Sequence, residues 1–164
     1  MKRLPLLLLL LATLPAAAMA QERAPEWMLS VHEDDLTLGW GTPETDHVEV
    51  VFHCIRGSDV VDFTYFATMP DAPDRLATRV VISGDAGDHA VAVIGTRLEL
   101  DDLFVLEGGL NFDETLSAIL LEDGSFTVSV EGEPDRTYST AGAEKAFETI
   151  IEACPLPETG FAEG

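Results

Sequence analysis

Hydrophobic and polar residues alternate along most of the chain, in short runs that are separated by polar or glycine-containing turns. The clearest run spans residues 48–55, where every second side chain from Val48 to Cys54 is apolar. A period of two is typical of a β-strand with one buried face. Further runs of this kind span residues 27–31, 36–40, 60–66, 79–82, 89–94, 104–110, 125–130 and 136–139.

The spacing of these runs predicts the fold class. Turn signals recur about every ten residues, among them the polar segment 32–35, the proline-rich segment 67–75 and the glycine-containing segment 83–88. Many short strands joined by such turns favour an antiparallel β-sandwich or barrel. We therefore expect a mainly-β domain of about eight to nine strands.

Two segments depart from the alternation and favour helices, and the first is residues 113–121. Three apolar residues of this segment, Leu116, Ile119 and Leu120, fall on one side of a helix. The acidic residues Asp113 and Glu114 suit the start of a helix, because the helix dipole is positive there. A short helix is therefore predicted over this segment.

The second and stronger helix is predicted at residues 141–154. Ser139 or Thr140 is expected to cap its N-terminus. Pro155 disfavours helical geometry at Cys154, so the helix should end there. Apolar residues recur at helical spacing, which makes one face apolar from end to end. That face comprises Ala143, Ala146, Phe147, Ile150, Ile151 and Cys154.

The chain contains two cysteines, Cys54 in the clearest strand and Cys154 at the end of the last helix. In an exported chain, two cysteines favour one disulfide bond, and no Cys-x-x-Cys motif supports free thiols instead. Closing a loop of about 100 residues is worth at most roughly 4 to 5 kcal/mol in the chain-entropy model. We expect the bridge to hold the helix over the sheet face that contains Val50 and Phe52. Shortening the chain before Phe147 should then unfold the protein.

The first 20 residues have the order of a secretory signal peptide, with a basic start, an apolar run and small residues before Gln21. The apolar run of about eleven residues is shorter than the roughly twenty that span a bilayer. Cleavage after Ala20 is therefore predicted, rather than a membrane anchor. Residues 21–154 would form a single β-rich domain and residues 155–164 a flexible tail, in the periplasm or outside the cell.

The composition is strongly acidic. Without Lys2 and Arg3, 7 basic residues remain against 30 acidic ones, which gives a net charge of −23. Such a charge repels nucleic acid and anionic lipid head groups, and this argues against both as partners. A salty habitat, cation binding and a basic protein partner remain as reasons for the charge.

No catalytic signature emerges from the sequence. The usual nucleophile, zinc and phosphate-loop motifs are missing. A Cys54–His53 nucleophile pair is disfavoured, because neighbours in a strand point to opposite faces. His53 and His89 could meet across a sheet, and Asp85 and Asp88 could offer oxygen ligands to calcium. Loops of aspartate and glycine between strands are ordinarily turns, so the four residues stay metal candidates only and no cofactor is assigned.

Adjacent carboxylates are the one remaining source of chemistry. Two such groups can serve as acid and base in a hydrolase. However, pairs arise by chance in a chain with 30 acidic residues. The pairs are Asp34–Asp35, Asp101–Asp102 and Glu122–Asp123.

Residues 136–147, Arg-Thr-Tyr-Ser-Thr-Ala-Gly-Ala-Glu-Lys-Ala-Phe, resemble the close of the invasion-associated locus B family and related small exported proteobacterial proteins. In that family a short strand runs into an alanine-rich terminal helix that contains a glycine. The start at Trp27, the signal peptide and the size are also similar. The resemblance implies a periplasmic or secreted β-sandwich without known catalysis, and it transfers no site residue. The two cysteines and the acidity depart from the family pattern.

The leading hypothesis from the sequence is a non-enzymatic exported β-domain that acts by binding. An acidic inhibitor of a basic enzyme such as lysozyme is one alternative, favoured by the charge and the small disulfide-bonded chain. A small hydrolase that uses a carboxylate pair is the other.

Overall fold

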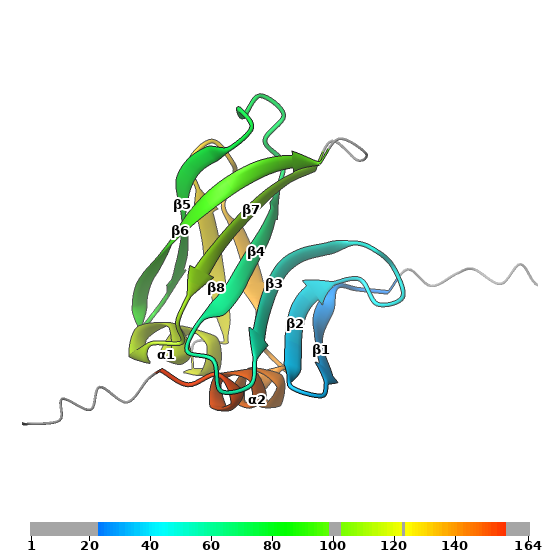
Figure 1. Ribbon diagram of the computed structural model, residues 1–164, viewed down its shortest axis with the longest axis vertical. Coiled ribbons are helices and arrows are strands. Elements are labelled where there is room, and N and C mark those ends of the chain that lie inside the picture. Colours follow the sequence, from blue (N-terminus) through cyan, green and yellow to red (C-terminus); the bar gives the residue numbers. More distant parts are fainter. Residues whose placement is uncertain (1–22, 99–102, 123, 157–164) are drawn as a thin grey trace, which may run out of the picture.

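Nine antiparallel strands form one sheet, which curls into a half-barrel (Figure 1). The computed structural model describes residues 23–98, 103–122 and 124–156. Neighbouring strands follow the order β1-β2-β3-β4-β7-β6-β5-β8-β9. The strands are β1 (Glu26–His32), β2 (Asp35–Gly41), β3 (Val48–Ile55), β4 (Val61–Ala67), β5 (Leu76–Gly84), β6 (Gly87–Leu98), β7 (Leu103–Leu110), β8 (Ser125–Val130) and β9 (Arg136–Ser139).

The mainly-β fold class predicted from the sequence is confirmed, and the strand count falls within the expected range. Several other predictions concern parts of the chain that the structure does not describe. They are the signal peptide at residues 1–20, the pair Asp101–Asp102, Asp123, and residues 157–164 of the predicted tail.

Two glycines allow the sheet to curl tightly. A side chain at Gly95 would lie 2.3 Å from the ring of Phe104, and one at Gly108 would lie 2.3 Å from the carbonyl oxygen of Ala92. Both distances are far below van der Waals contact, so β6 and β7 leave no room there for any other residue. Glycine within a strand often marks a bend of this kind.

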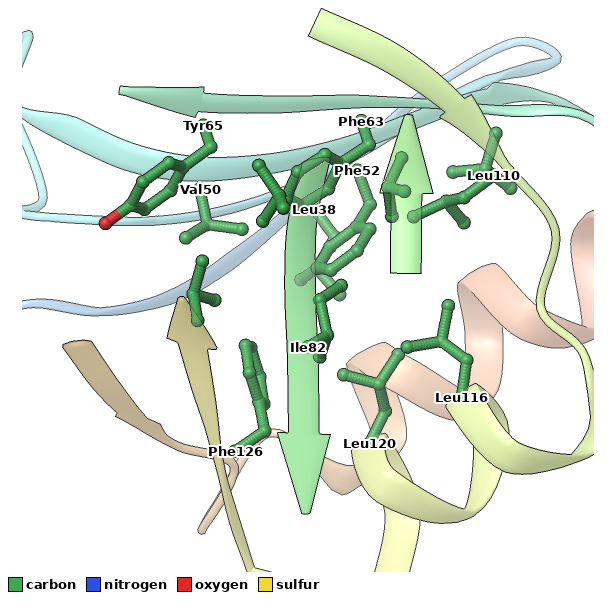
Figure 2. Packing of buried hydrophobic residues seen from close by; sticks show 14 of the residues in the cluster. Leu38, Val50, Phe52, Phe63, Tyr65, Ile82, Leu110, Leu116, Leu120 and Phe126 are labelled. Atoms are coloured by element: carbon green, nitrogen blue, oxygen red, sulfur yellow. The ribbon is translucent and has the colours of Figure 1, made fainter. Parts of the chain in front are cut away.

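The helices α1 (Glu114–Glu122) and α2 (Glu144–Ala153) cover one end of the curled sheet, which we call the helical end (Figure 1). Leu116 and Leu120 of α1 join the same buried cluster as Phe52 and Ile82 of the sheet (Figure 2). α2 packs against β1 and β2. Both predicted helices are present, and each buries its apolar residues against the sheet.

A disulfide joins Cys54 to Cys154, with the two Cα atoms 6.6 Å apart, as the sequence predicted. The N–H of Gly57 also donates to the carbonyl oxygen of Ala153 at 2.7 Å. Both links hold the end of α2 at the turn that follows β3. The helix therefore lies across the helical end rather than along the whole face of β3, because it is only 10 residues long and is fixed at the last residues of that strand.

The prediction of a loop over residues 83–88 is wrong in its extent. β5 continues to Gly84 and β6 begins at Gly87, so only Asp85 and Ala86 lie between the two strands. Gly87 takes a φ angle of +136°, which other residues rarely adopt. The glycines that indicated a loop instead allow the two strands to meet in a tight turn.

The predicted N-terminal cap of the last helix is also wrong. The helix begins at Glu144, and neither Ser139 nor Thr140 caps it; the preceding Ala143 makes no side-chain capping bond. Gly142 takes a φ angle of +82°, which turns the chain just before the helix. The N–H of Gly142 donates to the Glu144 carboxylate at 2.9 Å, and this bond lowers the pKa of that carboxyl group.

Candidate functional site

The outer face of β3, β4 and β7 contains a hollow of about 530 Å³. His53 of β3 lies opposite Asp62 of β4, and Thr64 of β4 lies opposite Glu107 of β7. Asp35 of β2 borders the hollow through its contact with His53. We call Asp35, His53, Asp62 and Glu107 the acidic hollow.

The alternation of the strands places these side chains outside the half-barrel. Their immediate neighbours Phe52, Phe63 and Leu106 are buried in the interior. Because successive side chains of a strand point to opposite faces, the polar residues between them must face outward. Gly109, which pairs with Asp62, adds no side chain to this face and so helps to keep the hollow open.

His53 lies between two carboxylates. Its Nδ1 is 3.3 Å from Oδ2 of Asp62, and its Nε2 is 3.5 Å from Oδ1 of Asp35. The side chains of His53, Asp62 and Asp35 are 37%, 74% and 58% exposed, respectively. Contacts between exposed side chains of this kind contribute little to folding stability. The carboxylates therefore remain accessible to a positively charged group from outside.

The geometry around His53 does not form a metal site. Asp35 and Asp62 contact opposite nitrogens of one imidazole ring, so they cannot ligate a single ion together with that ring as it stands. Within residues 23–98, 103–122 and 124–156, no group of three or more histidine, cysteine, aspartate or glutamate side chains is arranged to hold a metal.

The remaining metal candidates lie elsewhere. His89 is on β6, separated from His53 on β3 by the strands β4 and β7, so the structure does not bring the two histidines together. The Nδ1 of His89 lies 3.1 Å from Oδ2 of Asp113, whose Oδ1 accepts a hydrogen bond from the first turn of α1. Asp85 lies in the β5–β6 turn, and Asp88 is exposed at the start of β6. His89 thus supports the start of a helix.

A polar cluster closes the end of the half-barrel opposite the helices, which we call the polar end. Arg136 donates to Glu49 Oε2 at 3.3 Å, to Glu133 Oε1 at 2.5 Å and to Thr68 Oγ1 at 3.1 Å. The hydroxyl of Tyr138 also donates to Glu49, at 3.1 Å. The sixth member is Tyr65, whose ring lies 5.7 Å from the Arg136 guanidinium. Figure 2 shows the Tyr65 hydroxyl pointing away from the α1 leucines.

A β-bulge directs Glu49 into this cluster. β2 pairs Trp40 with Val50 but Gly41 with Val48, so Glu49 is an extra residue in β3. Bulges of this kind change the direction of a side chain and are common near functional sites. A side chain at Gly41 would lie 2.3 Å from the His47 carbonyl oxygen, which explains the glycine.

Two buried polar atoms of the cluster have no hydrogen-bond partner of good geometry, namely the Tyr65 hydroxyl and Glu133 Oε2. Burial, followed by the negative charge of Glu133, raises the pKa of Tyr65 to about 12. Burial also raises the pKa of Tyr138, and the nearby Tyr65 and Glu49 add to that shift. The two raised pKa values keep both tyrosine hydroxyls protonated at neutral pH.

The sequence did not reveal the polar cluster. Strict alternation placed Glu49 on the outer face, Glu133 fell in an ordinary turn, and Arg136 began a short strand with no predicted partner. One signal was available: the chain contains only two tyrosines, and Tyr65 and Tyr138 both lie in the cluster.

The two members of the carboxylate pair Asp34–Asp35 have separate roles in the structure. Asp35 joins the acidic hollow, while the backbone oxygen of Asp34 accepts a hydrogen bond from Arg56 N–H at 2.7 Å. The carboxylates that do converge are Glu49 and Glu133, which are not adjacent in the sequence. Arg136 lies between them and bonds to both.

The comparisons with known proteins add no relative: no family model matches the chain, and neither a curated protein nor a solved structure is significantly similar to it. The resemblance of residues 136–147 to the invasion-associated locus B family therefore stays a prediction. The disulfide fits an oxidising environment outside the cytoplasm. Among the described residues, no helix is long and apolar enough to cross a membrane.

Proposed function

We propose that the protein is exported, in the periplasm or secreted, and acts without catalysis by docking a basic protein at the acidic hollow. The observation that carries this proposal is that Asp62 and Glu107 line one open hollow of about 530 Å³, with Asp35 beside it in contact with His53. A lysine or arginine side chain of the partner would enter the hollow and pair with these carboxylates.

The charge of the whole chain supports this choice of partner. The predicted mature form carries a net charge of −23, which attracts basic proteins over a distance and speeds their encounter. The hollow adds a specific place for contact, because its carboxylates are exposed and no lysine or arginine among the described residues pairs with them. An inhibitor of a basic enzyme such as lysozyme is one form that this function can take.

A carboxylate-dependent hydrolase receives less support from the geometry. The two converging carboxylates, Glu49 and Glu133, both bond to Arg136, and the Glu133 side chain is fully buried. A hydrolase of this class needs two carboxyl groups that flank an accessible substrate. The acidic hollow is accessible, but its aspartates are paired with His53 on opposite sides of the ring.

The test is binding of a basic probe protein, hen lysozyme, to the chain from Gln21 onward. Binding should be clear at about 20 mM salt and much weaker at about 150 mM, because salt screens charges on this length scale. Replacing Asp62→Asn and Glu107→Gln together should weaken binding about tenfold, since measured couplings of close charge pairs at an interface begin at about 1.5 kcal/mol. Lysozyme activity measured in parallel would show whether docking inhibits the enzyme.

The matched control is Glu148→Gln with Glu152→Gln, two changes on the exposed side of α2 that alter the net charge equally. This pair should weaken binding less than about twofold, because only distant charge is lost. Equal effects of the two pairs would overturn the hollow as the docking site. Cytochrome c serves as a second basic probe. If neither it nor lysozyme binds at low salt, the proposal of a basic partner is wrong.

A further inference from the structure

The middle of strand β6, residues 90–94, is apolar on both of its faces. Val91 and Val93 are buried in the interior, while Ala90, Ala92 and Ile94 point outward and are exposed. A strand with one solvated face usually carries polar residues on that face, and continuous apolar runs are typical of strands that are covered on both sides. The outer side of β6 therefore has the composition of a covered surface.

The apolar surface continues onto the neighbouring strand β5. Ala77 and Val81 of β5 lie on the same outer face and pair with Ile94 and Ala90, respectively. A shallow hollow of about 830 Å³ lies over β5, β6 and β8. We call Ala77, Val81, Ala90, Ala92 and Ile94 the apolar face. Contiguous exposed apolar surface of this kind commonly marks an interaction site.

Only two charged residues line this hollow, Arg79 of β5 and Glu131 at the end of β8. Val80 pairs with Val130, so Arg79 and Glu131 occupy the next opposite positions along the two strands. Neither side chain forms an ion pair with another described residue. Their charges cancel, which makes this hollow electrically neutral in a chain whose net charge is −21.

We propose that a second copy of this chain covers the apolar face, with the two sheets packed face to face around a two-fold axis. In such an interface the same patch is used by both subunits, so the patch must be complementary to itself. Arg79 lies within the apolar face, between Ala77 and Val81, and Glu131 lies beside it, directly after β8. A mainly apolar patch with one positive and one negative residue meets this condition, because Arg79 can face Glu131 of the partner subunit and the reverse. Sheets commonly pack face to face in this way.

The charge pattern favours a second copy over a basic protein at this place. Arg79 would repel a basic partner, and the face offers only one carboxylate to attract it. Two copies would repel each other through their net charge, and the neutral face is where that repulsion is smallest. The acidic hollow lies on β3, β4 and β7, so this interface would use different strands and does not depend on the function proposed above.

The test is sedimentation equilibrium of the chain from Gln21 onward, at about 150 mM salt and protein concentrations from about 1 to 300 µM, since dimerisation follows mass action. A dimer should form within this range. Ile94→Glu should raise the dissociation constant at least about 30-fold, because it buries an unpaired carboxylate in the interface. Val31→Glu is the matched control, since Val31 is 50% exposed and Ile94 is 48% exposed.

A charge exchange tests the two-fold arrangement. Arg79→Glu should weaken the dimer, and adding Glu131→Arg to it should restore association, because opposite charges then face each other again. Unchanged circular dichroism and melting temperature would show that each variant is folded, and Ala92→Glu replaces Ile94→Glu if that variant unfolds. A monomer at every concentration overturns the dimer, and a dimer insensitive to Ile94→Glu overturns the apolar face as its interface. If the charge exchange does not restore association, the two-fold arrangement is wrong.

Discussion

The two ends of the half-barrel are closed by different forces. At the helical end, α1 and α2 bury Leu116, Ile119, Phe147 and Ile150. A disulfide fixes Cys154, directly after α2, to Cys54 of β3. At the polar end, Arg136 joins two carboxylates and a threonine in one network, with two tyrosine rings beneath.

The two ends should therefore respond differently to a change of pH and to the loss of a single residue. Apolar burial and a covalent bond do not depend on pH, and their loss leaves a cavity or a longer free chain. A buried network of charges depends on every member being present, because one missing partner leaves another charge unpaired. The helical end should therefore set the overall stability, and the polar end should set its dependence on pH.

The largest effect is expected from the disulfide. Replacing Cys54→Ser and Cys154→Ser together should lower the free energy of unfolding by up to about 4 to 5 kcal/mol, because the unfolded chain regains a loop of about 100 residues. Urea unfolding measures the loss. The oxidised and reduced forms of the parent protein provide the control, since reduction should reproduce it. A double variant within about 1 kcal/mol of the parent would show that the helical end is closed by packing alone.

The helical end is also the part that could be predicted from the sequence. The period of the apolar residues near Phe147 and the position of Cys54 in an alternating strand depend only on neighbours in the chain. The burial of both cysteines and the position of both helices follow from such local patterns. The cap near Thr140 failed because the positive φ of Gly142 moves the start of the helix.

The polar cluster, the acidic hollow and the apolar face could not be predicted in this way. Glu49 reaches its partners only through a bulge, and the sequence does not show which strand carries an extra residue. Asp62 and Glu107 line the same hollow only because β4 pairs with β7, and that pairing skips two strands in the chain order. These sites depend on long-range register, so of the acidic hollow only His53 and Asp35 were candidates beforehand, and nothing in the sequence placed them together.

The next largest effect is expected from removing Arg136, the cation of the polar end. Arg136→Met should lower the free energy of unfolding by about 3 kcal/mol, because Glu49 and Glu133 lose the cation that they share. The Arg136 side chain is 29% exposed, which places the effect at the lower end of the range for buried pairs. Urea unfolding provides the measurement, and Arg56→Met, at an exposed arginine, should cost less than about 0.5 kcal/mol.

A rescue experiment separates lost charge from lost packing. Adding Glu133→Gln to Arg136→Met removes one of the two unpaired carboxylates, so it should restore part of the stability. If the double variant is no more stable than Arg136→Met, the arginine acts through the packing of its side chain over Tyr65 instead.

The third prediction concerns alkaline pH. The pKa of Tyr65 is about 10 when unfolded and is raised to about 12 in the folded protein. Below pH 10 neither form loses this proton, and the contribution to stability is fully present. Between about pH 10 and 12 the unfolded form ionises first, so stability falls, by about 2 to 3 kcal/mol in all. The raised pKa of Tyr138 acts in the same direction.

Urea unfolding at several pH values, together with tyrosinate absorbance, measures this loss. Tyr65→Phe should flatten the dependence above pH 10 and should cost little at neutral pH, because the hydroxyl that it removes has no well-formed hydrogen bond. An unchanged alkaline slope in this variant would assign the effect to Tyr138 or to another group.

The smallest effect is expected at Trp27, which contacts residues of both ends. The Trp27 ring lies 4.9 Å from Phe147 of α2 and 6.5 Å from Tyr138 of the polar cluster. Its indole N–H donates to the carbonyl oxygen of Ser139 at 2.8 Å, and so joins the edge strands β1 and β9. Trp27→Phe keeps a ring in place but removes this bond, and should lower the free energy of unfolding by about 1 kcal/mol.

Trp40→Phe is the matched control for that change. Trp40 is also half-buried and contacts Tyr138 at 5.8 Å, but its indole N–H makes no hydrogen bond to the described residues. Both variants lose a similar ring area, so the difference between them in urea unfolding isolates the bond to Ser139. Equal losses would mean that the two edges of the sheet are held together by aromatic packing alone, and that the helical end and the polar end are stabilised independently.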